Sequence, residues 1–299
     1  MNSRFLRDHG WAARACAAAW ALCAGATRGD AELLEGRVEP PDPASASAPA
    51  QSPDAPADPR TWSVQFEPQM WFPALRGDIE MPGGSLFDVE TLDLDEPELS
   101  PAGELSIRGG DWIFQFNGFA FDVEAASRAD DAFAAGGGAG AVAVGDRVEY
   151  ELDYGAFEFN MGKHVWSVPL KDADDVAVDF DLYAGARAYA LDLRLETGSG
   201  VSSHDAQWAD ALVGMRMRLD LPHGFGLETA VDVGGGAFGV DGSFSWDITV
   251  AFTWVYENTA GIEIGFRHLS VDTVEGEGAE EFEFDNALAG LFGAVVIRF

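Results

Sequence analysis

Apolar and polar residues alternate along most of the chain after residue 61, in segments of roughly ten residues separated by Gly, Asp and Pro. In the clearest segment, residues 244–256, every second residue is apolar: Trp246, Ile248, Val250, Phe252, Trp254 and Tyr256. Successive side chains of a strand point to opposite faces, so this pattern predicts a strand with one apolar face. No helical period of useful length competes with this pattern.

Ten such segments predict ten strands, with eight or twelve as alternatives: residues 64–72, 105–107, 112–117, 148–154, 176–187, 211–221, 225–233, 244–256, 262–267 and 291–299. Breaks in the alternation near Gly118 and Gly155 predict β-bulges. Tight turns are expected at residues 109–111, 222–224 and 257–259. Longer loops are expected at 73–100, 126–146, 197–206 and 271–283, and a long turn, on the side of the tight ones, at 162–174.

The apolar faces of these segments need a cover, which is either lipid or a second sheet. A soluble sandwich would supply the second sheet. Aromatic residues at both ends of the apolar face of residues 244–256 instead match the girdles of a membrane barrel. The mean hydropathy of -0.03 also fits a barrel, because only every second residue meets lipid. The sequence therefore predicts an all-β fold, a transmembrane antiparallel up-and-down β-barrel over residues 61–299.

The last nine residues form an alternating strand that ends on an aromatic residue, with one face made of Leu291, Gly293, Val295, Ile297 and Phe299. A long apolar edge strand aggregates in a soluble protein, whereas closing a barrel removes the edge. The pattern resembles the signal that the barrel-assembly machinery of Gram-negative outer membranes reads. An ordinary core strand is the alternative interpretation.

The amino-terminal part has the composition of a processed segment. Residues 1–26 read as a secretory signal peptide with a positive region, an apolar run over 15–24 and small residues for cleavage at 24–26. The apolar run is too short for a membrane anchor. Residues 27–60, rich in Pro and Ala, read as a disordered periplasmic linker.

Charge and cysteine content exclude several functions. The net charge is -33, and removal of the signal, which carries a net +2, makes it about -35; such acidity argues against nucleic acid as a partner. Cys16 and Cys23 both fall in the predicted signal, so the mature chain would have no disulfide, thiolate metal site or catalytic cysteine.

Three segments in order, residues 181–189, 232–240 and 265–267, resemble strands of a large, mostly uncharacterised family of bacterial outer-membrane β-barrel proteins, small porin-like barrels of the OmpA and OmpW kind. The resemblance implies a place in the outer membrane, with outer-membrane lipid, lipopolysaccharide and the barrel-assembly machinery as partners. An even number of strands would leave both termini in the periplasm. The family has no agreed activity or catalytic residues, and the sequence leaves the oligomeric state open.

The polar faces of the predicted strands carry charges of both signs, among them Arg187, Arg216, Arg218, Asp232, Glu263 and Arg267. A ten-stranded barrel is narrow, so such side chains would fill the lumen as compensated pairs. A salt-bridged structural core is favoured over a conducting path.

Two expected loops are strongly acidic, around residues 78–98 and 275–285. Carboxylate clusters suit hard cations, but the spacing matches no defined calcium loop. A solvated surface is favoured over weak binding of divalent cations, and no cofactor or resident metal is predicted.

One short motif suggests an enzyme. His268-Leu269-Ser270, with Glu281 or Glu283 on the next strand, resembles the arrangement of outer-membrane lipid A deacylases. The resemblance implies a Ser270 nucleophile, a His268 base and an orienting glutamate, although Val271 stands where asparagine is expected. The favoured hypothesis is a non-enzymatic barrel, structural or a narrow channel for small solutes. The lipid hydrolase and surface adhesion through the acidic loops are the alternatives.

Overall fold

A computed structural model describes residues 62–169 and 176–299. The predicted signal and linker lie outside the described residues, as does the connection at 170–175. Residues Trp62–Phe299 form one compact unit. Among the described residues, no helix is long and apolar enough to cross a membrane.

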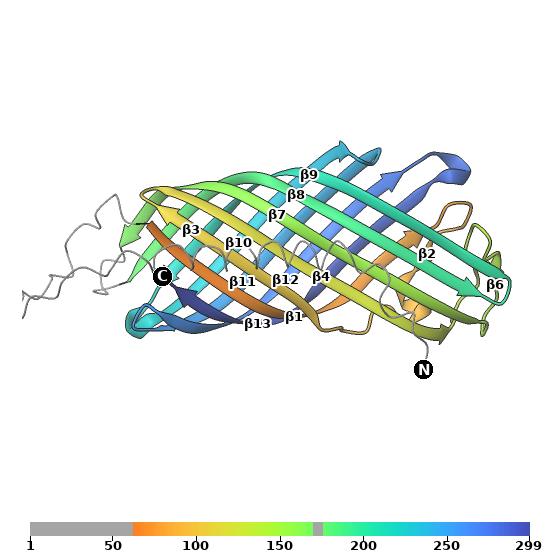
Figure 1. Ribbon diagram of the computed structural model, residues 1–299, viewed down its shortest axis with the longest axis horizontal. Helices are drawn as coiled ribbons and strands as arrows, with labels where there is room; N and C mark the ends of the chain where they lie inside the picture. The colour runs from red at the N-terminus through yellow and green to blue at the C-terminus, as the bar shows by residue number, and fades with distance from the viewer. Residues whose placement is uncertain (1–61, 170–175) are drawn as a thin grey trace, which may run out of the picture. The chain divides into compact units, whose positions relative to one another are not determined.

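Ten long antiparallel strands form the wall of the unit, and Figure 1 shows them winding obliquely around its axis. They are β1 (Trp62–Glu80), β3 (Ser100–Gly109), β4 (Trp112–Arg128), β7 (Arg147–Pro169), β8 (Ala177–Thr197), β9 (Gly200–Asp220), β10 (Phe225–Phe238), β11 (Gly242–Tyr256), β12 (Ala260–Glu275) and β13 (Phe282–Arg298). The connections contain the short strands β2 (Phe87–Asp88), β5 (Phe133–Ala134) and β6 (Ala141–Val142) and the 3-10 turns η1 (Val89–Leu92), η2 (Pro222–Gly224) and η3 (Gly278–Glu280). Each long strand pairs with the next, and β13 pairs with β1, so the sheet is closed.

The predicted fold class is therefore confirmed: the chain is a transmembrane antiparallel up-and-down β-barrel of ten strands. Each of the ten alternating segments lies mainly in one strand, and the three predicted tight turns lie between β3 and β4, β9 and β10, and β11 and β12. We call this end of the barrel, which also carries Phe299, the turn end and the other the loop end.

Two predicted connections are wrong because the strands are longer than expected. Residues 198–199 alone join β8 to β9, where a loop over 197–206 was predicted. The described part of the turn predicted at 162–174, residues 162–169, belongs entirely to β7. Apart from β3, the long strands have between 14 and 23 residues, whereas about 9–11 cross a membrane. The wall thus continues beyond the membrane.

The predicted bulges near Gly118 and Gly155 are also wrong. Strands β4 and β7 pair without a break from Trp112↔Lys163 to Arg128↔Arg147. The alternation changes because the apolar residues move from the outer face of the wall to its inner face in the loop-end half. Register shifts occur instead between His164 and Trp166 and between Gly235 and Phe238.

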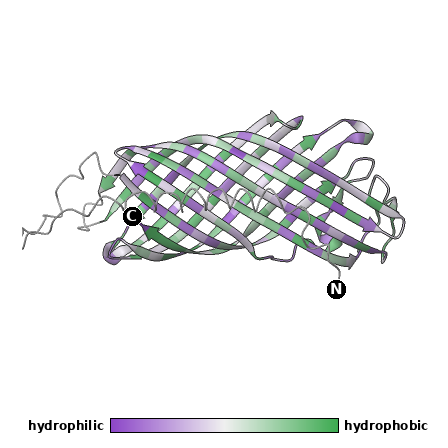
Figure 2. Ribbon diagram, viewed as in Figure 1, coloured by the Kyte–Doolittle hydropathy of each residue, from purple (hydrophilic) through white to green (hydrophobic). Residues whose placement is uncertain are grey.

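Large apolar side chains cover the outside of the turn-end half, and Figure 2 shows the alternation of hydrophobic and hydrophilic residues along the strands. Exposed members include Phe72, Leu182, Val213, Phe252, Ile264 and Leu291. At the turn end the exposed large side chains are mostly aromatic: Trp62, Trp112, Trp166, Tyr256 and Phe299. An apolar exterior with an aromatic girdle is typical of a barrel surface that faces lipid.

The seam between β1 and β13 closes the barrel. It runs from Gln65↔Arg298 to Glu80↔Glu283, and at the turn end the Phe299 amide donates to the Val64 carbonyl at 2.9 Å. Leu291 and Val295 of the predicted assembly signal are exposed on the outside, alternating with the buried Phe292 and Val296.

The seam tolerates no side chain at Gly290, because a Cβ there would lie 1.9 Å from the backbone oxygen of Phe72. We therefore expect Gly290→Ala to lower the yield of folded barrel, measured by heat-modifiable migration on gels. Gly293→Ala is the matched control on β13, since the nearest atom to its Cβ is 4.0 Å away. Equal yields for the two variants would contradict this account of the seam.

Candidate functional site

The barrel interior is divided into two parts. The turn-end half holds paired charges, which we call the charged layer. The loop-end half holds buried apolar side chains, which we call the apolar plug. Both parts are built from inward-pointing side chains of the same strands, because a residue two positions from an inward one also points inward.

Arg187 on β8 is the centre of the charged layer and is 1% exposed. Its Nε donates to Glu158 Oε2 at 2.7 Å, and its NH2 group donates to Asp232 at 3.0 Å. Asp247 lies 3.6 Å from the same guanidinium. Three carboxylates from three other strands thus surround one arginine, which compensates charges that would be costly to bury alone.

A second group of charges lies nearer the turn end. Arg216 on β9 contacts Glu104 and Glu228, each at 3.1 Å. Arg218, two residues further on, lies 3.1 Å from Asp181. These ion pairs link β3, β8, β9 and β10 across the lumen, so the cross-section at this level is filled by side chains.

Arg267 on β12 joins the two halves of the interior. Its Nε donates to Asp247 at 2.8 Å. Its guanidinium carbon also lies 5.3 Å from the ring centroid of Trp71 and 5.6 Å from that of Phe119. A cation over an aromatic face is attracted by the ring quadrupole, so Arg267 is compensated on one side and packed on the other.

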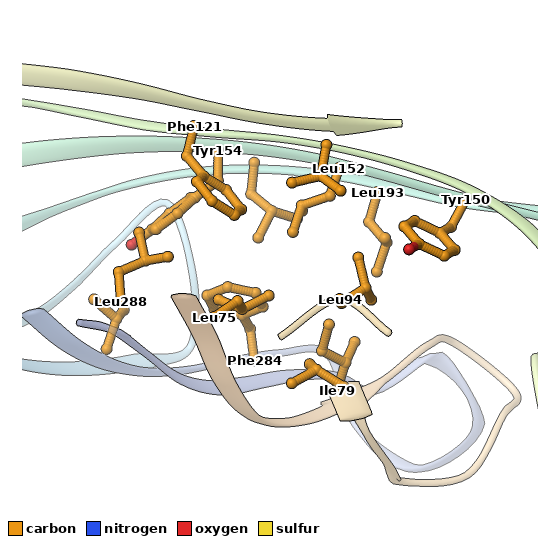
Figure 3. Close-up of a cluster of buried hydrophobic side chains, with 14 of the residues drawn as sticks. Leu75, Ile79, Leu94, Phe121, Tyr150, Leu152, Tyr154, Leu193, Phe284 and Leu288 are labelled. Atoms are coloured by element: carbon orange, nitrogen blue, oxygen red, sulfur yellow. The ribbon is translucent and has the colours of Figure 1, made fainter. Parts of the chain in front are cut away.

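The apolar plug begins at these rings, and Figure 3 shows its side chains pointing toward one another across the lumen. Its wall residues include Leu75, Ile79, Leu152, Leu193, Phe282 and Phe284, all 0% exposed. The loop between β1 and β3 adds Met81, Val89, Leu92 and Leu94, which are also buried. Because strands and loop pack together, the plug closes the lumen on the loop-end side.

Small cavities remain in the charged layer. One of about 60 Å³ is lined by residues that include Arg187, Arg216, Glu228, Asp232, Glu263 and Arg267. A second of about 40 Å³ lies toward the turn end and shares Arg216, Glu228 and Glu263 with the first. A water molecule needs about 10–15 Å³ measured in this way, so the cavities have room for a few water molecules and not for a larger solute.

The sequence-predicted lumen charges all lie in the interior, and the structure brings five of them into ion pairs: Arg187, Arg216, Arg218, Asp232 and Arg267. Glu263 is 7% exposed and lines both cavities. The sequence analysis missed Asp247, which two arginines contact. Asp247 could have been recognised as a lumen charge, because it lies on the polar face of residues 244–256.

The structure does not assemble the suggested hydrolase site. His268 and Ser270 both lie on the outer face of β12, and the His268 ring stacks on Trp246 at 4.5 Å between centroids. The residues opposite His268 are Ile248 and Ala289, so no carboxylate lies directly across from it. Glu281 immediately precedes β13, and its carboxylate accepts a hydrogen bond from the Gly278 amide at 3.4 Å.

The outer wall of the loop-end half carries two rows of aspartates that sequence analysis did not foresee. Strand pairing places four directly opposite one another in each row: Asp88, Asp78, Asp285 and Asp272 in one, and Asp122, Asp153, Asp192 and Asp205 in the other. Like charges at directly opposite positions are destabilising.

Two carboxyl groups of the rows, both beyond the membrane, have a raised pKa. Partial burial, with the neighbouring Asp88 and Asp285, raises the pKa of Asp78. Partial burial and Asp205 likewise raise the pKa of Asp192. Among the residues described, no three His, Cys, Asp or Glu side chains gather so that they could hold a metal ion.

A closed ten-stranded barrel with an apolar, aromatic-rimmed exterior defines the class of bacterial outer-membrane β-barrel proteins. The chain is similar to three solved barrels of that class: the outer membrane protease OmpT from Escherichia coli (6% identity, TM-score 0.44, covering 79% of this chain and 97% of that chain), Neisserial surface protein A (10%, 0.30, 80% and 97%) and the attachment invasion locus protein Ail of Yersinia pestis (9%, 0.30, 80% and 99%). No family model and no curated protein matches the chain.

Replacing the central arginine should destabilise the barrel strongly. Arg187→Met would leave Glu158, Asp232 and Asp247 in the interior without their common partner, and such a loss costs about 3–5 kcal/mol. Denaturant unfolding of detergent-refolded protein measures the change. The control is Arg194→Met on the same strand, whose exposed pair with Glu196 should be worth about 0–1 kcal/mol.

The aspartate rows should make the barrel more stable in mild acid. A carboxyl whose pKa is higher in the folded than in the unfolded state contributes stability at low pH that is lost as the pH rises through the folded pKa. The unfolding midpoint should therefore be higher at pH 5 than at pH 7. Asp78→Asn should raise stability at pH 7 by roughly 0.2–1 kcal/mol, the size of a cross-strand pair effect, and reduce the pH dependence. If Asp78→Asn leaves the pH dependence of stability unchanged, the row that contains Asp78 does not contribute to that dependence.

Proposed function

We propose that this protein is a structural, non-conducting outer-membrane barrel that presents a rigid acidic wall beyond the membrane. The single observation that carries the proposal is the apolar plug. Leu152, Leu193 and Phe282 have no exposed surface, and they fill the lumen at a level where a channel would need water.

The location of the two ends follows from the lengths of the connections. Outer-membrane barrels have short periplasmic turns and longer outer loops. The turn end, with Phe299, would accordingly face the periplasm, and the loop end with the aspartate rows would face outside. Outer-membrane lipid, lipopolysaccharide and the barrel-assembly machinery are the partners that this orientation implies.

The alternatives have less support. A narrow solute channel would need a route past both the ion pairs around Arg187 and the apolar plug. A lipid hydrolase built on Ser270 would need a carboxylate beside His268, where Ile248 and Ala289 lie. Adhesion through acidic loops would add a partner to the same closed barrel and needs no change in its architecture.

Planar-bilayer recording of the refolded protein tests the proposal. We expect no steady current, because a dry apolar layer excludes hydrated ions. Insertion is checked independently by heat-modifiable migration and by protection of the barrel from trypsin in vesicles. A steady, cation-preferring conductance from inserted protein would favour the narrow channel instead.

A further inference from the structure

One side-chain cluster at the turn end adjoins the charged layer and is joined to it through the ion pair between Asp181 and Arg218. It lies on β7 and β8, where the pairing shifts register between His164 and Trp166. In a regular strand, residues three apart point to opposite faces. The irregularity places both His164 and Ser167 on the inner face, while Trp166 between them stacks on Phe180 at 5.4 Å on the outer face.

His164 lies between a hydroxyl and a carboxylate. Its Nε2 is 2.9 Å from Ser167 Oγ, and its Nδ1 is 3.0 Å from Asp181 Oδ1. Each ring nitrogen therefore has one partner at hydrogen-bonding distance. The order hydroxyl, Nε2, Nδ1, carboxylate is the geometry in which a histidine acts as a base toward a serine.

Asp181 is held so that one oxygen faces the histidine. Its side chain is 3% exposed, and Arg218 and Arg108 contact its Oδ2 at 3.1 and 3.4 Å. Oδ1 is thereby left for His164. A carboxylate oriented in this way favours the tautomer with hydrogen on Nδ1 and leaves Nε2 free to accept the serine proton.

We propose that Ser167, His164 and Asp181 form a nucleophilic triad that cleaves small carboxylic esters at the turn-end mouth of the barrel. Ser167 is exposed, so a substrate in water can reach its oxygen. The assignment goes beyond the structural role proposed above and does not depend on it, since the apolar plug lies in the other half of the barrel.

The reaction balances with these groups and water. Ser167 Oγ attacks the ester carbonyl carbon while its proton moves to His164 Nε2. The bond to the alcohol oxygen then breaks, and the departing alkoxide takes that proton. A water molecule next gives a proton to His164 and attacks the acyl-serine, and Ser167 leaves with the proton returned. The net change is ester plus water to acid plus alcohol.

Asp179 restrains this nucleophile. The Ser167 hydroxyl also donates to Asp179 Oδ1, and a hydroxyl has only one proton to donate. While the Ser167 hydroxyl donates its hydrogen bond to Asp179, it cannot donate to His164. The negative charge of Asp179 also opposes the oxyanion that develops during the attack. The two neighbouring carboxylates should therefore have opposite effects, with Asp181 promoting reaction and Asp179 slowing it.

A fluorophosphonate probe on the refolded full chain tests the triad. The serine oxygen displaces fluoride and forms a stable phosphonyl ester, which mass spectrometry locates. We expect labelling at Ser167, none at that position in Ser167→Ala, and a decrease of roughly 100-fold or more in the labelling rate for His164→Gln, the contribution of a general base. Ser63→Ala, at an exposed serine of the same end, should label as the unchanged protein does.

The two aspartates distinguish a nucleophilic site from a merely structural cluster. Asp179→Ala should speed labelling and hydrolysis of p-nitrophenyl acetate, whereas Asp181→Asn should slow both. Heat-modifiable migration confirms that each variant is folded. The proposal is overturned if folded, unchanged protein labels no faster than Ser167→Ala, or if both aspartate variants alter the rate in the same direction.

Discussion

A sheet in lipid has no water to satisfy the backbone groups along its edges, and the whole structure depends on how this chain meets that constraint. The seam between β1 and β13 joins the first strand to the last over their lengths, from Gln65↔Arg298 to Glu80↔Glu283. Every long strand then has a partner on both sides. Closure with ten strands also fixes a narrow lumen, which inward side chains must fill.

The lumen is filled differently in its two halves because the surroundings of the wall change. Where lipid covers the outside, the outward positions are apolar and the inward ones carry charge, so Arg187 and Arg216 each gather carboxylates from several strands. Beyond the membrane, the outside faces water and the polarity of the wall is reversed. Outward positions become acidic, and the inward ones form a soluble-type core around Leu152 and Leu193.

This reversal explains which features could be predicted from the sequence. Period-two alternation is enough to find the ten strands and to assign Arg187, Arg218 and Arg267 to the polar face. Alternation does not say which face lies inside once lipid no longer covers the wall. A single outward apolar face along the whole strand requires a bulge near Gly155, whereas Val148 and Tyr154 are buried inside and the pairing runs through Gly155 unbroken. The aspartate rows could not be found either, because they depend on register between residues as distant as Asp78 and Asp285.

The irregularity that does occur in β7 lies where the alternation predicts a turn. His164 and Ser167 are three residues apart, a spacing that regular strand geometry assigns to opposite faces, so no period-two reading could bring them together. Only the shifted register opposite β8 does so, and it sets His164 opposite Asp181 and Ser167 opposite Asp179. Bulges cost a pairing and re-aim side chains, which is why they recur beside active sites. In a closed barrel such a departure is tolerated most easily near an end of the wall, where few further pairs must follow it, and the turn end of β7 meets that condition.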